Sequence, residues 1–243
     1  MEERVGKRGR VAAFLSERML RTAAMVSRGN RTADVGCDHA YTSIYLIEQE
    51  IAPTVVAMDV NAGPLERAKE NVKRFGKEEQ ISLRLSDGLE ALLPGETDTV
   101  LIAGMGGPLM ERILSAYPAT VKSVKELVLQ PQSEVASLRR FLHENGFRIT
   151  EEDMLCEDGK YYVIMRAEHG TDEPWTEEEY VYGKRLKEEA VPVLLEFLRK
   201  EREKTKAVLA DLETAGTHKA ENRKEEMLAL LQKNVEMERR LTE

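Results

Sequence analysis

Residues 32–41, Thr-Ala-Asp-Val-Gly-Cys-Asp-His-Ala-Tyr, decide how the first half of this 243-residue chain folds. A β-prone stretch passes through a single glycine straight into a helix, which is how a nucleotide-binding α/β sheet begins. A dinucleotide turn has closely spaced glycines that let the backbone approach a pyrophosphate, but here only Gly36 is present. The carboxylates of Asp34 and Asp38 would repel a pyrophosphate and attract the ammonium and sulfonium groups of S-adenosylmethionine. The turn therefore favours S-adenosylmethionine over NAD and leaves an NAD-dependent oxidoreductase as a distant alternative.

Strand-like and helix-like segments alternate around this turn. The predicted strands are Thr32–Val35, Thr54–Val60, Ile81–Leu85, Thr99–Ala103, Glu126–Leu129, Phe147–Leu155 and Tyr161–Ala167. The predicted helices are Tyr41–Glu50, Pro64–Phe75 with Asn61 as its cap, Pro108–Ala116 and Glu134–Asn145. Alternation predicts a parallel sheet covered on both faces, and the short turn at 157–160 predicts a hairpin that reverses the last strand. Seven strands in this order resemble the Rossmann-like α/β sheet of class I methyltransferases.

Helices are also predicted at both ends of the chain. Apolar residues recur at helical spacing over residues 15–26, which predicts one amphipathic helix. Near the other end, Thr176–Glu213 and Ala220–Leu241 predict an antiparallel coiled-coil hairpin, with Pro192 bending its first arm. The residues expected to face each other in the hairpin include Leu194, Leu198, Val235 and Met237. The predicted domains are residues 1–170, with 1–31 as a basic helical segment, and residues 171–243.

Charge is distributed unevenly along the chain. The formal net charge is −8, and such a chain is not the default candidate for binding a polyanion. However, residues 1–31 hold eight Lys and Arg against three acidic residues, whereas residues 32–170 hold 14 against 23. The N-terminal segment can therefore meet phosphates even though the central domain is acidic. We expect Arg10, Arg18 and Arg21 to contact a nucleic acid substrate.

Several classes of protein are disfavoured by what the sequence lacks. Cys37 and Cys156 are the only cysteines, and neither a basic leader with an apolar stretch nor an apolar run of about 20 residues occurs. The four histidines are scattered, without the spacing of metal ligands, and there is no G-x-S-x-G nucleophile turn. We therefore expect a cytoplasmic protein without a disulfide framework, a membrane span or a metal ion.

Acidic and glycine residues follow the next three predicted strands. Asp59 ends the second strand, where an acid in this topology accepts hydrogen bonds from ribose hydroxyls. Asp87-Gly88 follows the third strand, where a carboxylate can accept a hydrogen bond from an adenine amino group. Residues 103–107, Ala-Gly-Met-Gly-Gly, follow the fourth strand. Because the carboxyl ends of parallel strands meet at one edge of the sheet, these residues indicate a single cofactor crevice.

Four motifs in this order make the chain similar to a known family. They are Asp34-Val-Gly-Cys-Asp-His-Ala-Tyr41, Ile102-Ala-Gly-Met-Gly-Gly107, Leu129-Gln-Pro131 and Glu157-Asp-Gly-Lys-Tyr-Tyr162. They resemble the bacterial family of tRNA methyltransferases that act on N1 of adenine 22. The resemblance covers roughly residues 14–243, including the helical hairpin. It implies S-adenosylmethionine as methyl donor, tRNA as acceptor and N1-methyladenine as product.

The resemblance also implies which residues form the site. The residues expected to bind the cofactor are Asp34, Gly36, Asp59, Asp87, Gly88, Ala103, Gly104 and Met105. The residues expected to face the target base are Asp38, His39, Tyr41, Gln130 and Pro131. We expect Asp38 to be the catalytic carboxylate, with His39 and Tyr41 as pocket walls or hydrogen-bond partners. A carboxylate that accepts a hydrogen bond from the adenine amino group stabilises the positive charge that develops as N1 is methylated.

Two alternatives remain open from the sequence. One is a methyltransferase for a small molecule or a protein, and the other is a cofactor-binding interaction module without turnover. Methylases of the exocyclic adenine amine usually carry an (Asn/Asp)-Pro-Pro-aromatic turn after the fourth strand. Residues 103–107 lack that turn, which favours a ring nitrogen as the acceptor. The expected state is a monomer whose hairpin could contact RNA or another protein.

Overall fold

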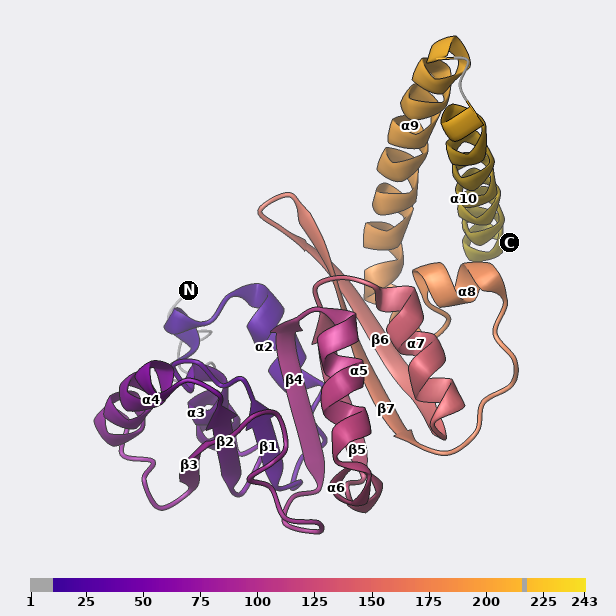
Figure 1. Cartoon of the computed structure of the whole chain (residues 1–243). Coiled ribbons are helices and arrows are strands. Elements are labelled where there is room, and N and C mark those ends of the chain that lie inside the picture. Colours follow the sequence, from indigo (N-terminus) through magenta and orange to yellow (C-terminus); the bar gives the residue numbers. More distant parts are fainter. Residues whose placement is uncertain (1–10, 216–217) are drawn as a thin grey trace.

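A computed structural model describes residues 11–215 and 218–243 of the chain (Figure 1). Seven strands form one sheet in the order β3-β2-β1-β4-β5-β7-β6. Their bounds are β1 Thr32–Val35, β2 Val55–Asp59, β3 Ile81–Leu85, β4 Thr99–Met105, β5 Glu126–Pro131, β6 Phe147–Glu157 and β7 Lys160–His169. The first five strands are parallel, and β7 pairs antiparallel with both β5 and β6. The predicted α/β fold and its reversed final hairpin are confirmed.

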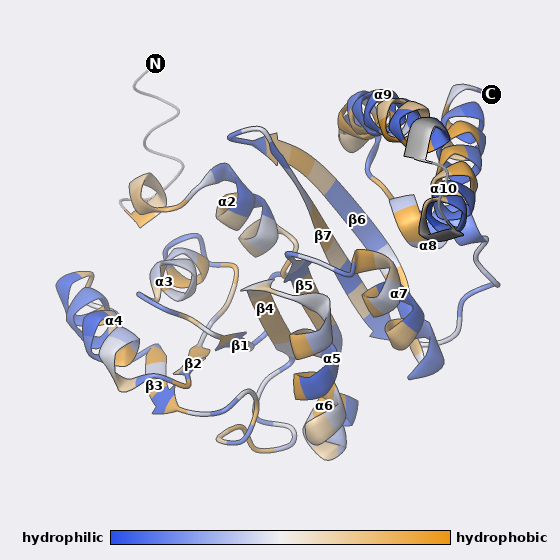
Figure 2. Ribbon diagram, turned by 45° about the horizontal axis from the view of Figure 1, so that its top comes forward, coloured by the Kyte–Doolittle hydropathy of each residue, from blue (hydrophilic) through white to orange (hydrophobic). Residues whose placement is uncertain are grey.

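Helices cover both faces of the sheet (Figure 2). They are α3 Tyr41–Glu48, α4 Ala62–Arg74, α5 Gly107–Ala116, α6 Pro118–Ser123 and α7 Val135–Glu144. Successive residues of a strand point to opposite faces, so Val56 and Met58 pack with the residues of α5 and α7, while Val55 and Ala57 pack with those of α3 and α4. Helix α6 was not predicted. Pro118 lies in its first turn, where backbone N–H groups have no partner within the helix, so the N–H that proline lacks is not needed.

The N-terminal segment differs from the single helix expected over residues 15–26. It contains the 3-10 turn η1 (Val11–Phe14) followed by the separate helix α2 (Glu17–Ala24). Ser16 has an extended backbone, and its hydroxyl accepts a hydrogen bond from the N–H of Met19 at 3.4 Å. This is an N-cap, which ends the preceding turn and starts the helix.

The C-terminal region is interrupted where a single helix, Thr176–Glu213, was expected. That prediction is wrong, because the segment folds into α8 (Glu177–Tyr182), the 3-10 turn η2 (Glu188–Ala190) and α9 (Val191–Ala215). Gly183 ends α8 with φ +100°, a conformation that no continuing helix can adopt. Pro192 does not bend the first arm either, since it is the second residue of α9 and needs no intrahelical hydrogen bond there.

A buried ion pair explains this interruption. The Nε of Arg139 in α7 donates to Oε1 of Glu152 in β6 at 2.7 Å, and both side chains are fully buried. Oε2 of Glu152 accepts the N–H groups of Lys184 and Arg185, which directly follow Gly183. A Cβ on Gly183 would lie 2.8 Å from Oε2 of Glu152. The chain therefore crosses this carboxylate at a position that only glycine can occupy.

The arms α9 and α10 (His218–Thr242) run antiparallel and project beyond the sheet (Figure 1). Leu194, Leu198 and Met237 are buried between them and β6, as expected. Val235 was expected to face the other arm but is 48% exposed, because the neighbouring Asn234 takes the interior position. The amide of Asn234 donates to the carbonyl oxygen of Leu198 at 2.9 Å and to Glu201, which satisfies its buried polar group.

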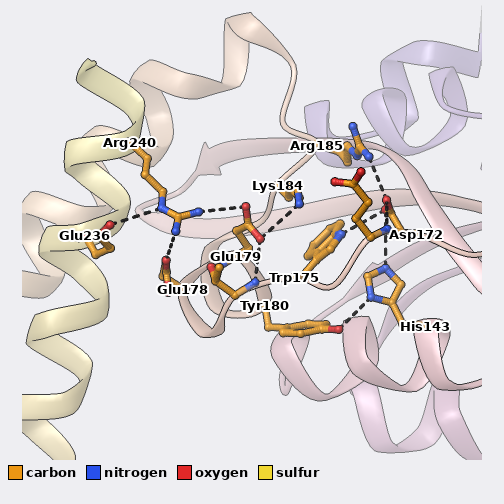
Figure 3. A network of polar contacts seen from close by, with 12 residues as sticks. His143, Asp172, Trp175, Glu178, Glu179, Tyr180, Lys184, Arg185, Glu236 and Arg240 are labelled. Carbon is orange, nitrogen blue, oxygen red and sulfur yellow. Dashed lines mark hydrogen bonds and ion pairs between the residues drawn. The ribbon is translucent and has the colours of Figure 1, made fainter.

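A second polar network fixes the base of the hairpin to the sheet domain (Figure 3). His143 of α7 lies 3.0 Å from the hydroxyl of Tyr180 in α8, and its ring packs edge-on against Trp175. Arg240 of α10 reaches the carboxylates of Glu178 and Glu179 at 2.7 and 3.1 Å.

The division of the chain into two domains at residue 170 stays a prediction. Within residues 11–215 and 218–243, no helix combines the length and apolarity needed to cross a membrane.

Candidate active site

The turn after β1 has an unusual backbone. Gly36, Asp38 and Ala40 all have positive φ, at +76°, +48° and +59°. For a residue with a side chain this conformation costs roughly 1–2 kcal/mol, so Asp38 and Ala40, two positions apart, are held there by their surroundings. The same kind of strain occurs at many functional sites. It supports the idea that this turn is built for binding or catalysis.

Strand β2 and helix α4 hold the turn. The N–H groups of Gly36 and Cys37 both donate to the carbonyl oxygen of Met58 in β2. The N–H of Asp38 donates to Oδ2 of Asp59 at 3.2 Å, and the carbonyl of His39 accepts from Nδ2 of Asn71 in α4 at 3.0 Å. Asp59 therefore supports the turn from beneath, a role that the sequence did not indicate.

The turn opens into a cleft of about 410 Å³, within the usual range of about 300–1,000 Å³ for ligand sites. Of the predicted site residues, the lining includes Arg18, Asp34, Gly36, Asp38, His39, Tyr41, Ala103 and Gly104. The other lining residues are Phe14, Leu15, Ser16, Met19, Cys37 and Thr42. Apart from Arg18, the contribution of η1 and α2 was missed, since an amphipathic pattern does not say which residues of a helix reach a distant turn.

Asp34 lies at the floor of the cleft and is almost completely buried. Its Oδ2 accepts a hydrogen bond from the hydroxyl of Ser43 in α3 at 2.6 Å. Burial raises the pKa of Asp34 to about 6, with the Ser43 hydrogen bond opposing the rise and the nearby Asp59 adding to it. A carboxylate in this position binds a cation strongly when it is ionised, because little water screens it.

Glycines shape the walls of the cleft. A Cβ on Gly36 would lie 2.4 Å from the methyl carbon of Met105, so Met105 packs directly over the turn. Gly104, at φ +77°, forms a bulge in β4 between Ala103, which pairs with Gln130, and Met105. A bulge bends the strand and redirects the residues that follow it. It opens the crevice at the carboxyl end of β4.

The predicted site residues outside this lining, among those that the structure describes, are Arg21, Asp59, Asp87, Gly88, Met105, Gln130 and Pro131. Asp87 is exposed and lines a separate hollow of about 270 Å³ with Ile113 and Tyr117. Gly88 lies beside Ile113, which a Cβ on it would contact at 3.0 Å. Gln130 and Pro131 are buried at the end of β5, next to the bulge of β4.

Arg18 and Arg21 of the N-terminal segment both have partners within the chain. Arg18 points into the cleft, where its guanidinium donates to Oε1 of Gln130 and lies 5.1 Å from the centre of the Tyr162 ring. Arg21 contacts Asp153 at 3.3 Å and Glu17 at 3.2 Å. Arg10 lies outside the residues that the structure describes.

A row of rings forms one side of the cleft. The ring of Phe14 stacks on Tyr41 with centres 5.0 Å apart and planes 11° from parallel, and Tyr41 lies 5.9 Å from His39. The side chain of Asp38 is 66% exposed and reaches Nε2 of His39 only at 3.6 Å. An exposed carboxylate thus stands beside an aromatic surface, which suits a flat, partly cationic ligand.

Cys37 lines the cleft, but its thiol is not activated. Burial raises the pKa of the Cys37 thiol, and the neighbouring Asp34 raises it further, so the reactive thiolate is disfavoured. Within the part of the chain that is described, no three His, Cys, Asp or Glu side chains lie close enough to share a metal ion.

Comparison with known proteins identifies the family. The model of the TrmK family, tRNA (adenine(22)-N(1))-methyltransferase, matches residues 32–237. The chain belongs to this family. The match spans the cleft residues from Asp34 onward and most of the hairpin. The TrmK family, the enzyme class and the S-adenosylmethionine-dependent methylation expected from the sequence are thereby confirmed.

Individual members of the TrmK family resemble the chain throughout. The tRNA (adenine(22)-N(1))-methyltransferase of Bacillus subtilis strain 168 is 36% identical over 156 residues, which are 64% of this chain and 66% of that protein, just under two thirds. The crystal structure of the B. subtilis enzyme has a TM-score of 0.80 at 29% identity and covers 91% of this chain and 97% of its own. Sp1610 of Streptococcus pneumoniae, solved with S-adenosyl-L-methionine, has a TM-score of 0.80 at 34% identity, covering 91% and 98%.

Proposed function

We propose that the cleft transfers the methyl group of S-adenosylmethionine to N1 of adenine 22 in tRNA, with Asp38 as the catalytic carboxylate. The observation that carries this assignment is the position of Asp38. Its side chain is exposed in the same cleft whose floor is the buried Asp34. One carboxylate is thus available to the cofactor and another to the target base. We further expect the protein to act in the cytoplasm and as a monomer.

The cleft residues fit the cofactor chemically. Asp34 would face the ammonium group of the methionyl moiety, and Arg18, which also lines the cleft, would face its carboxylate. Gly36 lines the cleft without a side chain, so the cofactor could approach its backbone. Asp59 and Asp87 remain the residues proposed for the ribose hydroxyls and the adenine amino group. When bound, the cofactor supplies an electrophilic methyl group on its sulfonium.

Asp38 would act on the base that receives the methyl group. Adenine N1 lies on the Watson–Crick edge, so the target nucleotide must be unpaired or turned out of its stack to reach the cleft. The Asp38 carboxylate would accept a hydrogen bond from the 6-amino group, stabilise the positive charge that develops on the ring and later accept a proton. His39 and Tyr41 would hold the plane of the base, with Gln130 and Pro131 behind it. Correct positioning of N1 supplies much of the remaining rate.

Product mapping tests this function. The protein is incubated with S-adenosylmethionine and an unmodified tRNA transcript. Reverse transcription then locates N1-methyladenine, because this base stops the reverse transcriptase. We expect one stop, at adenine 22, and none in a transcript with guanine at that position. Methylation of a metabolite or protein extract without any RNA product would instead support the alternative of a small-molecule or protein methyltransferase. Cofactor binding without turnover on any substrate would support the interaction module.

Acidification is expected to weaken cofactor binding. The pKa of Asp34 is raised to about 6, so the carboxylate that faces the ammonium group becomes protonated below that pH. The dissociation constant of S-adenosylhomocysteine should be nearly constant from pH 8 to 7 and then rise, approaching tenfold per pH unit below about 6. Calorimetric titration measures it. Asp34→Asn should bind more weakly at pH 8 and show a flat profile, and a wild-type profile that is equally flat would contradict the role of Asp34.

The raised pKa of Asp34 also predicts whether the substitution Asp34→Asn raises or lowers the stability of the fold. Because the folded chain holds the Asp34 proton more tightly than the unfolded chain, the stability that Asp34 contributes is present at low pH and is lost as the pH rises through about 6. Asp34→Asn should therefore raise the midpoint of thermal unfolding at pH 7.5, and raise it less at pH 5.

A further inference from the structure

The basic residues of the described N-terminal segment are already used within the chain. In addition to Arg18 and Arg21, Arg28 donates to the carbonyl oxygens of Gln49 and Glu50, and Arg31 pairs with Asp98 at 2.9 Å. A guanidinium held by such contacts has fewer donors left, and it has less freedom to turn toward a phosphate. The cations that meet the RNA should therefore be sought among exposed groups near the cleft that have no acidic partner.

Helix α4 carries two such groups on one face. Arg67 and Arg74 are exposed, seven residues apart and so two turns along the same side, with Asn71 between them. Neither arginine has a carboxylate within ion-pair distance among the described residues. Glu70 is the acidic residue of α4 that lies within about one turn of both arginines, at i+3 from Arg67 and i−4 from Arg74. It forms no ion pair with either. We call Arg67, Asn71 and Arg74 the α4 stripe.

The α4 stripe is tied to the catalytic turn by direct contacts. Asn71 donates to the carbonyl oxygen of His39 at 3.0 Å. The guanidinium carbon of Arg74 lies 5.6 Å from the centre of the Phe14 ring, and Phe14 in turn stacks on Tyr41. Phe14 is 47% exposed and lines the cleft. A cation at Arg74 is therefore connected by stacked rings to the site where the target base is expected.

We propose that the α4 stripe binds the backbone phosphates of the RNA strand that carries the target adenine. This rests on the proposed function, since it places the substrate of the same cleft. Arg74, beside Phe14 of the cleft, and Arg67, on the same face of α4, match the charge of a polyanion within a domain that is otherwise acidic. Phosphate contacts of this kind set the register of the strand without reading its sequence, which would deliver one nucleotide to Asp38.

Charge reversal tests the proposal. Arg67→Glu and Arg74→Glu are each compared with Lys122→Glu, a matched change in α6, which precedes β5 and lies at the opposite ends of the strands from the cleft. Each α4 variant should raise the dissociation constant for tRNA about tenfold at 100 mM salt and lower the slope of its logarithm against log salt by about 0.7–0.9. Lys122→Glu should change neither quantity. The affinity for S-adenosylhomocysteine should stay within twofold of wild type.

Removing a negative charge beside the stripe should have the opposite effect on tRNA affinity and provides a second test. Glu70→Gln removes the acid beside the stripe and should tighten tRNA binding a few-fold. Equal tRNA affinity for Arg67→Glu, Arg74→Glu and Lys122→Glu would overturn the proposal, as would a loss of S-adenosylhomocysteine binding that accompanies the loss of tRNA binding. Failure of the proposed function looks different, because wild-type protein would then leave adenine 22 unmethylated whatever the α4 variants bind.

Discussion

Asp38→Ala should lower the rate of tRNA methylation by at least about 10²–10³-fold, the usual effect of removing a group that stabilises transition-state charge. The affinity for S-adenosylhomocysteine should stay within a few-fold of wild type, because the buried Asp34 provides the carboxylate at the floor of the cleft. Single-turnover methylation of a tRNA transcript, together with calorimetric cofactor binding, separates the two effects. Asp38→Asn should be nearly as slow. Asparagine tolerates the positive φ of this residue but carries no charge.

Asp158 provides a matched control for this prediction. It is also an exposed aspartate with positive φ, at +50°, but it lies in the turn between β6 and β7 and does not line the cleft. Asp158→Ala therefore imposes the same backbone strain and the same loss of charge elsewhere. We expect it to retain wild-type turnover. If Asp38→Ala keeps most of the turnover as well, Asp38 has no chemical role.

Among the single substitutions considered, Glu152→Gln should cause the largest loss of stability. It leaves the guanidinium of Arg139 buried without a counter-ion, and breaking a buried pair in this way costs about 3–5 kcal/mol. In a chain of this size that should lower the midpoint of thermal unfolding by roughly 10 °C. The change also weakens the acceptor for the N–H groups of Lys184 and Arg185, so the connection between α8 and α9 should loosen first. Calorimetry measures the midpoint, and hydrogen exchange locates the loosening.

A double-mutant cycle separates the ion pair from packing. Arg139→Gln combined with Glu152→Gln removes both charges, so the double variant should be more stable than the sum of the single losses implies. Glu196→Gln is the control, because Glu196 is paired with Lys200 at the surface and solvent screens that pair. A Glu152→Gln midpoint no lower than that of Glu196→Gln would contradict the role assigned to the buried pair.

The sheet and the cofactor turn could be predicted because their signals are local. Each buried strand is a short β-prone run bounded by turn residues, and β1 and β3 have the bounds expected. The turn at Gly36 could be interpreted from its own charges, because Asp34 and Asp38 lie within two residues of the glycine. Strand ends in a parallel sheet must meet at one edge, so Ala103 and Gly104 reach the same cleft.

The basic segment and the C-terminal arm could not be predicted in the same way. Counting charges in residues 1–31 could not show that Arg18 turns inward to Gln130 or that Arg31 pairs with Asp98, because those partners lie 112 and 67 residues away. The helical pattern over Thr176–Glu213 is continuous in the sequence. Only the buried carboxylate of Glu152 shows why the chain must break at Gly183.

The sequence by itself determined the order of strands and helices, the chemistry of the turn and the family, because these depend on neighbouring residues and on the rules that govern parallel sheets. The tertiary structure decided which charges remain available. An arginine binds RNA or stabilises the fold depending on whether an acceptor from a distant part of the chain reaches it first. That competition is why we propose the α4 stripe, beside the row of rings that leads to Asp38, for phosphate contacts, while contacts from Arg18 and Arg21 stay a prediction.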